Sequence, residues 1–203
     1  SIGSISAISS FYRAQGKKIG VIWIDTHSDI HTPTTSISKN IHGMSIAFLA
    51  GLAPGAFASL SGDQAAVSLD SLAYIGLRDV DSAEKEVIKK QSISAFTAHN
   101  IDRWGMGQVV EEAIKIASKD TAGFVVSFDL DVCDPNIAPA TGTPMRGGLT
   151  YRESHLALEM LHESGRMLGF ELVEYNPDLE DERCQTGELA ISLVESALGA
   201  RIL

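Results

Sequence analysis

KIGVIWIDTHSD, residues 18–29, is the stretch of sequence that decides the fold. It begins with a run of apolar, mostly β-branched residues and ends in two acids that flank His27. An apolar run without polar alternation predicts a strand buried on both faces, as in a parallel sheet that helices cover. Ligands bind beyond the carboxyl ends of such strands, so this polar end is a candidate site.

Four further segments carry similar apolar runs, and helical patterns lie between them. The runs cover residues 71–77, 92–96, 123–131 and 167–173, and the apolar helical stripes cover residues 104–118, 151–163 and about 187–198. Thr150 and Glu153 form a capping-box signal at the start of one of these helices. This alternation predicts an α/β fold, a three-layer α-β-α arrangement around a mostly parallel sheet. No linker or repeat interrupts residues 1–203, so we expect a single domain.

Composition excludes several classes of function. The chain has 203 residues and a formal charge of −10, from 16 Lys and Arg against 26 Asp and Glu. Without a Lys/Arg cluster, this balance argues against binding to nucleic acid or to an anionic membrane. No apolar run approaches the roughly 18 residues of a spanning helix. The two cysteines have no Cys-x-x-Cys spacing, which argues against a thiolate zinc site and predicts a reducing, cytoplasmic location.

Acids at two strand ends predict a metal centre. Asp25, His27 and Asp29 alternate along one segment, and Asp129 and Asp131 alternate at the end of another. In extended backbone, alternate side chains share a face, so each motif gathers hard ligands. One such acid is commonly only a turn or cap residue. Two motifs of paired acids at buried strand ends instead favour neutralisation by one or two divalent cations.

Longer motifs resemble the arginase family of ureohydrolases, in register along the whole chain. These are IDTHSDIHTP at 24–33, NIHGM at 40–44, YIGLRDVD at 74–81, SFDLDVCDP at 127–135, APATGTP at 138–144, GGLTYRE at 147–153 and ELVEYNP at 171–177. The resemblance implies two Mn²⁺ ions per complete active site and hydrolysis of L-arginine to L-ornithine and urea, a step of arginine metabolism. It also implies a homo-oligomer, a trimer or a hexamer.

The resemblance also implies roles for individual residues. The expected metal ligands are Asp25, His27, Asp29, Asp129 and Asp131, with Asp25 and Asp129 bridging both ions. His42 corresponds to the proton-shuttling histidine, and Glu174 to the partner of the substrate guanidinium. The expected substrate-binding residues are His27, His31, Ser36, Ser38, Asn40, Asp81, Glu84, Thr143 and Glu174.

Two departures from the family pattern leave alternatives open. The Gly-Gly-Asp-His segment that supplies a further histidine ligand in arginases is absent, so we expect an N-terminally incomplete chain that binds at most one manganese tightly and turns over slowly. His31 stands where arginases usually have Asn. The alternatives are a ureohydrolase that acts on agmatine or a guanidino acid, and a catalytically dead arginase-like subunit.

Overall fold

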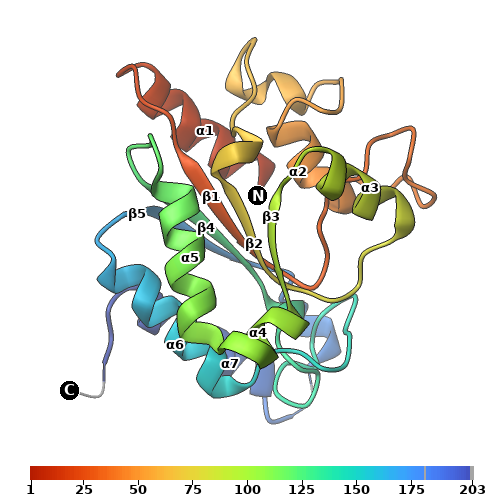
Figure 1. Ribbon diagram of the computed structural model, residues 1–203. Coiled ribbons are helices and arrows are strands. Elements are labelled where there is room, and N and C mark those ends of the chain that lie inside the picture. The colour runs from red at the N-terminus through yellow and green to blue at the C-terminus, as the bar shows by residue number, and fades with distance from the viewer. Residues whose placement is uncertain (181, 202–203) are drawn as a thin grey trace.

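A five-stranded parallel sheet forms the centre of the computed structural model, which describes residues 1–180 and 182–201. Its order is β3-β2-β1-β4-β5 (Figure 1). The strands are β1 (Gly20–Ile24), β2 (Leu72–Leu77), β3 (Ser94–Thr97), β4 (Phe124–Asp129) and β5 (Met167–Val173). All five expected strands are confirmed, and β5 has the expected bounds.

Helices cover both faces of the sheet, which confirms the three-layer α/β prediction (Figure 1). One layer holds α1 (Ile2–Arg13), α2 (Ser45–Leu49) and α3 (Ser82–Lys90); the other holds α4 (Ala98–Trp104), α5 (Met106–Ser118), α6 (Tyr151–Glu163) and α7 (Gln185–Ala197). Side chains alternate along a strand, so Val21 and Trp23 pack against the first layer and Ile22 and Ile24 against the second. The central strand thereby joins two apolar cores.

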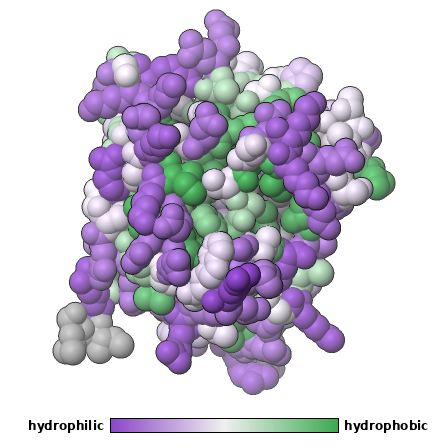
Figure 2. All heavy atoms as spheres, in the orientation of Figure 1, coloured by the Kyte–Doolittle hydropathy of each residue, from purple (hydrophilic) through white to green (hydrophobic). Residues whose placement is uncertain are grey.

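Burial falls from the centre of the sheet to its edges. Every residue of β1, β2 and β4 is buried, whereas every residue of β3 and β5 is partly exposed. Figure 2 shows apolar side chains between polar ones in the middle of one face, where Figure 1 places β2 and β3. In the described part of the chain, no helix has the length and apolarity of a membrane span.

Gly76 lets the loop after β4 lie directly against β2. Its φ is +97°, and the register between β2 and β3 shifts at this point. A Cβ atom here would lie 2.4 Å from Cγ2 of Val132 and 3.3 Å from the carbonyl oxygen of Asp25. Only glycine combines this backbone conformation with so close an approach. The carboxyl end of β2 is therefore drawn close to the segments that follow β1 and β4.

Candidate active site

Three carboxylates meet because three adjacent strands end at the same edge of the sheet. Asp25 follows β1, Asp129 ends β4 and Glu174 follows β5. Ile24 pairs with Phe128 and Asp129 pairs with Val173, so the residues at these strand ends are neighbours in space. In a parallel sheet the register of the strands alone produces this meeting.

His27 binds two of the acids at the centre of the site. Its Nδ1 atom lies 3.1 Å from Oδ2 of Asp131 and 3.5 Å from Oδ1 of Asp25. One donor atom from each of these three residues falls within 4.8 Å of the others. Nε2 of His27 faces outward, 3.7 Å from Oδ2 of the exposed Asp79. The structure thus brings together three of the five expected metal ligands as one mixed nitrogen and oxygen set.

Hydrogen bonds hold these carboxylates in place. The indole Nε1 of Trp23 donates to Oδ2 of Asp25 at 2.9 Å, and the backbone N–H of His27 donates to Oδ1 of Asp25 at 2.6 Å. The hydroxyl of Thr143 donates to Oδ2 of Asp131 at 2.9 Å. The backbone N–H of Asp131 donates to Oδ1 of Asp129 at 2.8 Å. Each acid therefore has a fixed orientation before any ligand arrives.

Burial makes this group of negative charges unfavourable by itself. It raises the pKa of Asp25 to about 6, although hydrogen bonding to His27 opposes the shift. Burial, followed by the charge of Asp25, raises the pKa values of Asp29 and Asp129 well above their usual range. Burial would lower the pKa of His27, but hydrogen bonds to Asp131 and Asp25 raise it to about 11. A positive charge at the site is thus strongly favoured.

The donor set fits a divalent metal ion. Oδ1 of Asp131 is a buried carboxylate oxygen without a hydrogen-bond partner, which is costly unless a cation or another donor approaches it. Carboxylate oxygens with one imidazole nitrogen are ligands that hard and borderline divalent ions accept. In the described chain, the donor atoms of Asp25, His27 and Asp131 converge and are best placed to hold such an ion. Asp29 and Asp129 are close enough for the charges of Asp25 and Asp131 to raise their pKa values.

A hollow of about 450 Å³ reaches two of the five expected metal ligands, Asp29 and Asp129. Asp29 and Asp129 line it from below, and His42 and Glu174 line it together with Trp23. His42 begins a single 3₁₀ turn, His42–Met44, and its side chain is exposed. The structure therefore brings both expected catalytic residues to the same hollow as the acids.

Apart from His27, Thr143 and Glu174, the expected substrate-binding residues form two groups. His31 reaches the start of α3, where its Nε2 lies 2.9 Å from Oδ2 of Asp81 and 3.9 Å from Oε2 of Glu84. These two acids also form the capping box of α3: Oδ1 of Asp81 accepts the backbone N–H of Glu84, and Oε2 of Glu84 accepts the backbone N–H of Asp81. Ser36, Ser38 and Asn40 belong to the loop after His31 and are not among the residues that line the hollow over Asp29 and Asp129.

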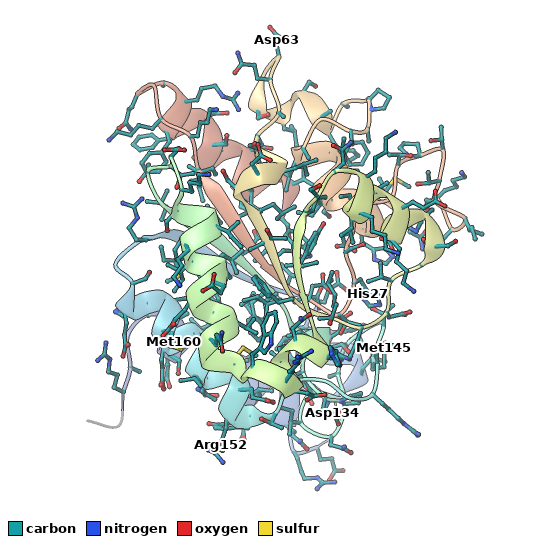
Figure 3. All side chains as sticks on the ribbon, in the orientation of Figure 1. His27, Asp63, Asp134, Met145, Arg152 and Met160 are labelled. Atoms are coloured by element: carbon teal, nitrogen blue, oxygen red, sulfur yellow. The ribbon has the colours of Figure 1, made fainter. Side chains whose placement is uncertain are left out.

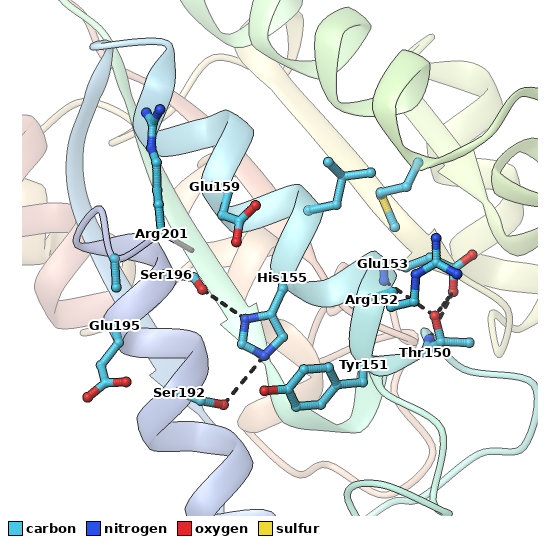
Figure 4. A pocket seen from close by; sticks show the side chains of 13 residues that line it. Thr150, Tyr151, Arg152, Glu153, His155, Glu159, Ser192, Glu195, Ser196 and Arg201 are labelled. Atoms are coloured by element: carbon cyan, nitrogen blue, oxygen red, sulfur yellow. Dashed lines mark hydrogen bonds between the residues drawn. The ribbon is translucent and has the colours of Figure 1, made fainter. Parts of the chain in front are cut away.

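A larger hollow, of about 850 Å³, lies between α6 and α7, away from the strand ends (Figure 4). His155 stands in it between two hydroxyls, 2.8 Å from Oγ of Ser196 and 3.4 Å from Oγ of Ser192. The ring of Tyr151 lies 4.2 Å from that of His155, measured between centroids. None of the expected site residues lines this hollow, and no group of metal ligands forms there among the described residues. We therefore assign the chemistry to the smaller hollow.

Four residues that organise the site were not expected from the sequence. Trp23 supports Asp25, and the buried hydroxyl of Tyr74 donates to the carbonyl of Ser28 at 2.7 Å. Thr26 and Arg78 hold the loop that carries Asp131. Alternation along β1 places Trp23 beside Asp25, a signal that was available. The partners of Tyr74 and Arg78 lie far away in the sequence, so no local pattern reveals their contacts.

Comparison with known proteins shows the family of this chain. The model of the arginase family matches residues 1–199. The chain is 47% identical to an arginase of Emericella nidulans over 210 aligned positions, which include the whole chain and 64% of that relative. It is similar in structure to an arginase of Bacillus subtilis (TM-score 0.90, 36% identity, 100% of this chain and 79% of that one). It is also similar in structure to an arginase of Entamoeba histolytica in complex with L-ornithine (TM-score 0.88, 31% identity), and this match covers 97% of this chain and 66% of that one.

The match extends over the strands and loops that build the site. The chain spans slightly less than two thirds of the length of the curated relative from Emericella nidulans. The residues described above, from Asp25 to Glu174, fall within the part that the family model matches. On the sequence, the fold and the geometry of the strand ends together, the chain belongs to the arginase family.

Proposed function

We propose that this chain carries the manganese centre of an arginase, which hydrolyses L-arginine to L-ornithine and urea. One observation carries the proposal: Asp25, His27 and Asp131 converge on one point, where Oδ1 of Asp131 is buried without a partner. The hollow that Asp29 and Asp129 line offers Glu174 and His42. Acids, imidazole and an open approach are the parts that hydrolysis of a guanidinium group needs.

Asp25, His27, Asp129 and Asp131 would hold one manganese ion, and Asp25, Asp29 and Asp129 would contribute to a second. Divalent manganese, when bound, acidifies water and so provides a nucleophile near neutral pH. The protein contributes the orientation of its acids, since the Trp23 and Thr143 donors fix two of the carboxylates. Trp23 also fills one wall of the hollow with apolar surface, which strengthens electrostatic interactions inside it.

Glu174 would bind the substrate guanidinium. It follows β5 with φ +63°, a left-handed conformation that turns the chain at the end of the strand. A carboxylate and a guanidinium form two parallel charge-assisted hydrogen bonds, which fixes the plane of the substrate. Because Asp129 lies on the next strand, this contact would hold the guanidinium carbon beside the acids.

His42 would move the proton that completes the reaction. Attack of water on the guanidinium carbon leaves one proton in excess, and breaking the carbon–nitrogen bond requires one proton on the departing amine of ornithine. An exposed imidazole at the rim of the hollow can pass a proton between this amine and solvent through its ring nitrogens.

The other end of the substrate would meet the residues beside α3. Asp81 and Glu84 offer negative charge to the α-ammonium group, and His31 offers an N–H group to the α-carboxylate. Ser36, Ser38 and Asn40 would add hydroxyl and amide donors from their loop. The Entamoeba histolytica relative was solved with L-ornithine, which supports an amino-acid ligand for this family. We further expect a homo-oligomer, and light scattering during gel filtration would test this by measuring its molar mass. We also expect a cytoplasmic location.

The test of this function combines metal content with urea release. Elemental analysis of the purified chain measures manganese per chain, and a colorimetric assay measures urea from L-arginine, with agmatine as the competing substrate. We expect manganese to be bound and L-arginine to be preferred over agmatine. Asp131→Asn should lose the metal, whereas Asp79→Asn, a change at the exposed acid beside His27, should keep it. Equal metal content in both variants would contradict the proposal.

A further inference from the structure

Arg78 occupies an unusual position behind the metal centre. It follows β2 directly, and its guanidinium donates only to backbone carbonyl oxygens among the contacts the structure records. Nη2 lies 2.8 Å from the carbonyl of Asp131 and 2.8 Å from that of Met145. Nη1 lies 3.0 Å from the carbonyl of Val132, and Nε lies 3.3 Å from that of Arg146. One planar group therefore joins two separate segments of the loop after β4.

The joined segments are the ones that present the Asp131 carboxylate. Asp131 and Val132 belong to the first segment, and Met145 follows closely after Thr143, whose hydroxyl donates to Oδ2 of Asp131. Figure 3 shows Met145 and His27 on the same side of the molecule, at the lower right of the view. Holding both segments on one guanidinium fixes the distance between the carboxylate and its donor.

Thr26 closes the connection from the side of β1. Its hydroxyl donates to the same Asp131 carbonyl at 2.7 Å, and its own carbonyl accepts the backbone N–H of Arg78 at 3.0 Å. The ends of β1, β2 and β4 are thus tied together around the backbone of one metal-ligand candidate. An uncharged side chain could not satisfy so many carbonyls at once, because only arginine presents five N–H groups in a planar fork.

We propose that Arg78 is a positioning residue of the metal centre: it fixes the backbone of Asp131 against residues 143–146, so that the Asp131 carboxylate faces the cation in one orientation. The proposal rests on the proposed function in one respect, namely that Asp131 binds the metal. Arg78 itself touches neither the metal nor the substrate. Loss of its contacts should therefore weaken metal binding through the orientation of Asp131.

Arg166 offers a matched control at the opposite end of the sheet. It lies just before β5, and its Nη2 also donates to two backbone carbonyls, those of Thr121 at 2.9 Å and Ser118 at 3.4 Å. Arg166→Lys and Arg78→Lys therefore remove similar contacts, but only Arg78 is near the acids. Lysine keeps the charge and loses the fork, so each comparison isolates the geometry of the hydrogen bonds.

The experiment measures manganese affinity by electron paramagnetic resonance of the free ion, with thermal unfolding of the metal-free chains measured in parallel. Both Lys variants should unfold at a lower temperature than the wild type. Arg78→Lys should weaken manganese binding by about tenfold or more, as loss of an outer-shell partner does. Arg166→Lys should leave the affinity unchanged. If Arg78→Lys fails to fold, Thr26→Val provides a second test. This variant removes the hydroxyl that donates to the carbonyl of Asp131, and it should also weaken manganese binding.

Failure of the positioning role and failure of the proposed function give different results in this experiment. Unchanged manganese affinity in Arg78→Lys, or an equal loss in Arg166→Lys, would overturn the positioning role and leave Arg78 as a purely structural residue. Failure of the wild-type chain to bind manganese would instead overturn the proposed function. The wild-type measurement separates the two cases.

Discussion

Replacing Asp25 by Asn should stabilise the metal-free chain while it destroys the metal site. Asp25 is 1% exposed, and burial raises its pKa from 3.8 to about 6. Its folded state therefore binds a proton more tightly than its unfolded state. The free energy of unfolding of the metal-free chain falls as the pH rises from about 4 to about 6, and the loss is complete above that range.

The size of the effect follows from this difference in pKa. About two pKa units correspond to about 3 kcal/mol at neutral pH. This is an upper limit, because Trp23 and His27 donate to different oxygens of Asp25, and Asn has one oxygen that can accept only one of these two hydrogen bonds. For a domain of this size that corresponds to about 6–12 °C in melting temperature. With manganese added at about one thousand times its Kd the order should reverse, since the ligand then stabilises the wild type alone by about 4.1 kcal/mol, which exceeds the advantage of the variant.

Urea denaturation of chelator-treated chains at pH 7 and at pH 4 is the assay. The variant should be the more stable chain at pH 7, and the difference should shrink at pH 4. Asp79→Asn, at an exposed acid near the same histidine, serves as the control and should change little. A metal-free Asp25→Asn chain that is less stable than the wild type at pH 7 would refute the reasoning, because it would mean that the buried carboxylate carries no net cost.

Three further results are expected. Gly76→Ala should destabilise the chain by about 2–4 kcal/mol in urea denaturation, because the added methyl group would clash with Val132 at a positive φ. The control Gly62→Ala, at φ +87° with open space around it, should lower the free energy of unfolding by less, and equal losses would contradict the close approach at Gly76. Cys133 is buried, and burial raises its pKa to about 12, so in the folded chain at pH 8 only the exposed Cys184 should react with a thiol reagent. A second equivalent should react once guanidinium chloride unfolds the chain, and two fast equivalents in the folded chain would contradict this prediction. His42→Ala should lower urea release by roughly 10²–10⁴-fold in a complete form of the enzyme while manganese stays bound, and joint loss of metal and activity would make His42 a ligand.

The strands and their carboxyl ends could be predicted from the sequence because burial on both faces leaves an unbroken apolar run. The run before Asp25, which forms the fully buried β1, shows this directly. The segment that forms β5 has the expected bounds, although all its residues are partly exposed. Parallel strands then place acids at one edge by geometry alone, which brought Asp25, Asp129 and Glu174 together.

Short elements and long-range contacts could not be predicted in the same way. Helix α2 has five residues, too few to show a helical period. Helix α3 is different, because the capping-box spacing of Asp81 and Glu84 in the sequence could have indicated where it begins. The carbonyls that bind Arg78 lie 53–68 positions further along the chain. The folded loop determines which carbonyls the Arg78 guanidinium reaches, and the spacing of residues along the sequence does not reveal them.

Manganese content of the purified 203-residue chain tests the central claim most directly. Elemental analysis after gel filtration should find one tightly bound manganese per wild-type chain, and almost none in Asp131→Asn, because the partnerless oxygen of Asp131 and its neighbours Asp25 and His27 would no longer form a charged ligand set. The Asp79→Asn control should retain the wild-type amount. A wild-type chain that folds and stays free of manganese, or an Asp131→Asn chain that binds as much as the wild type, would contradict the account.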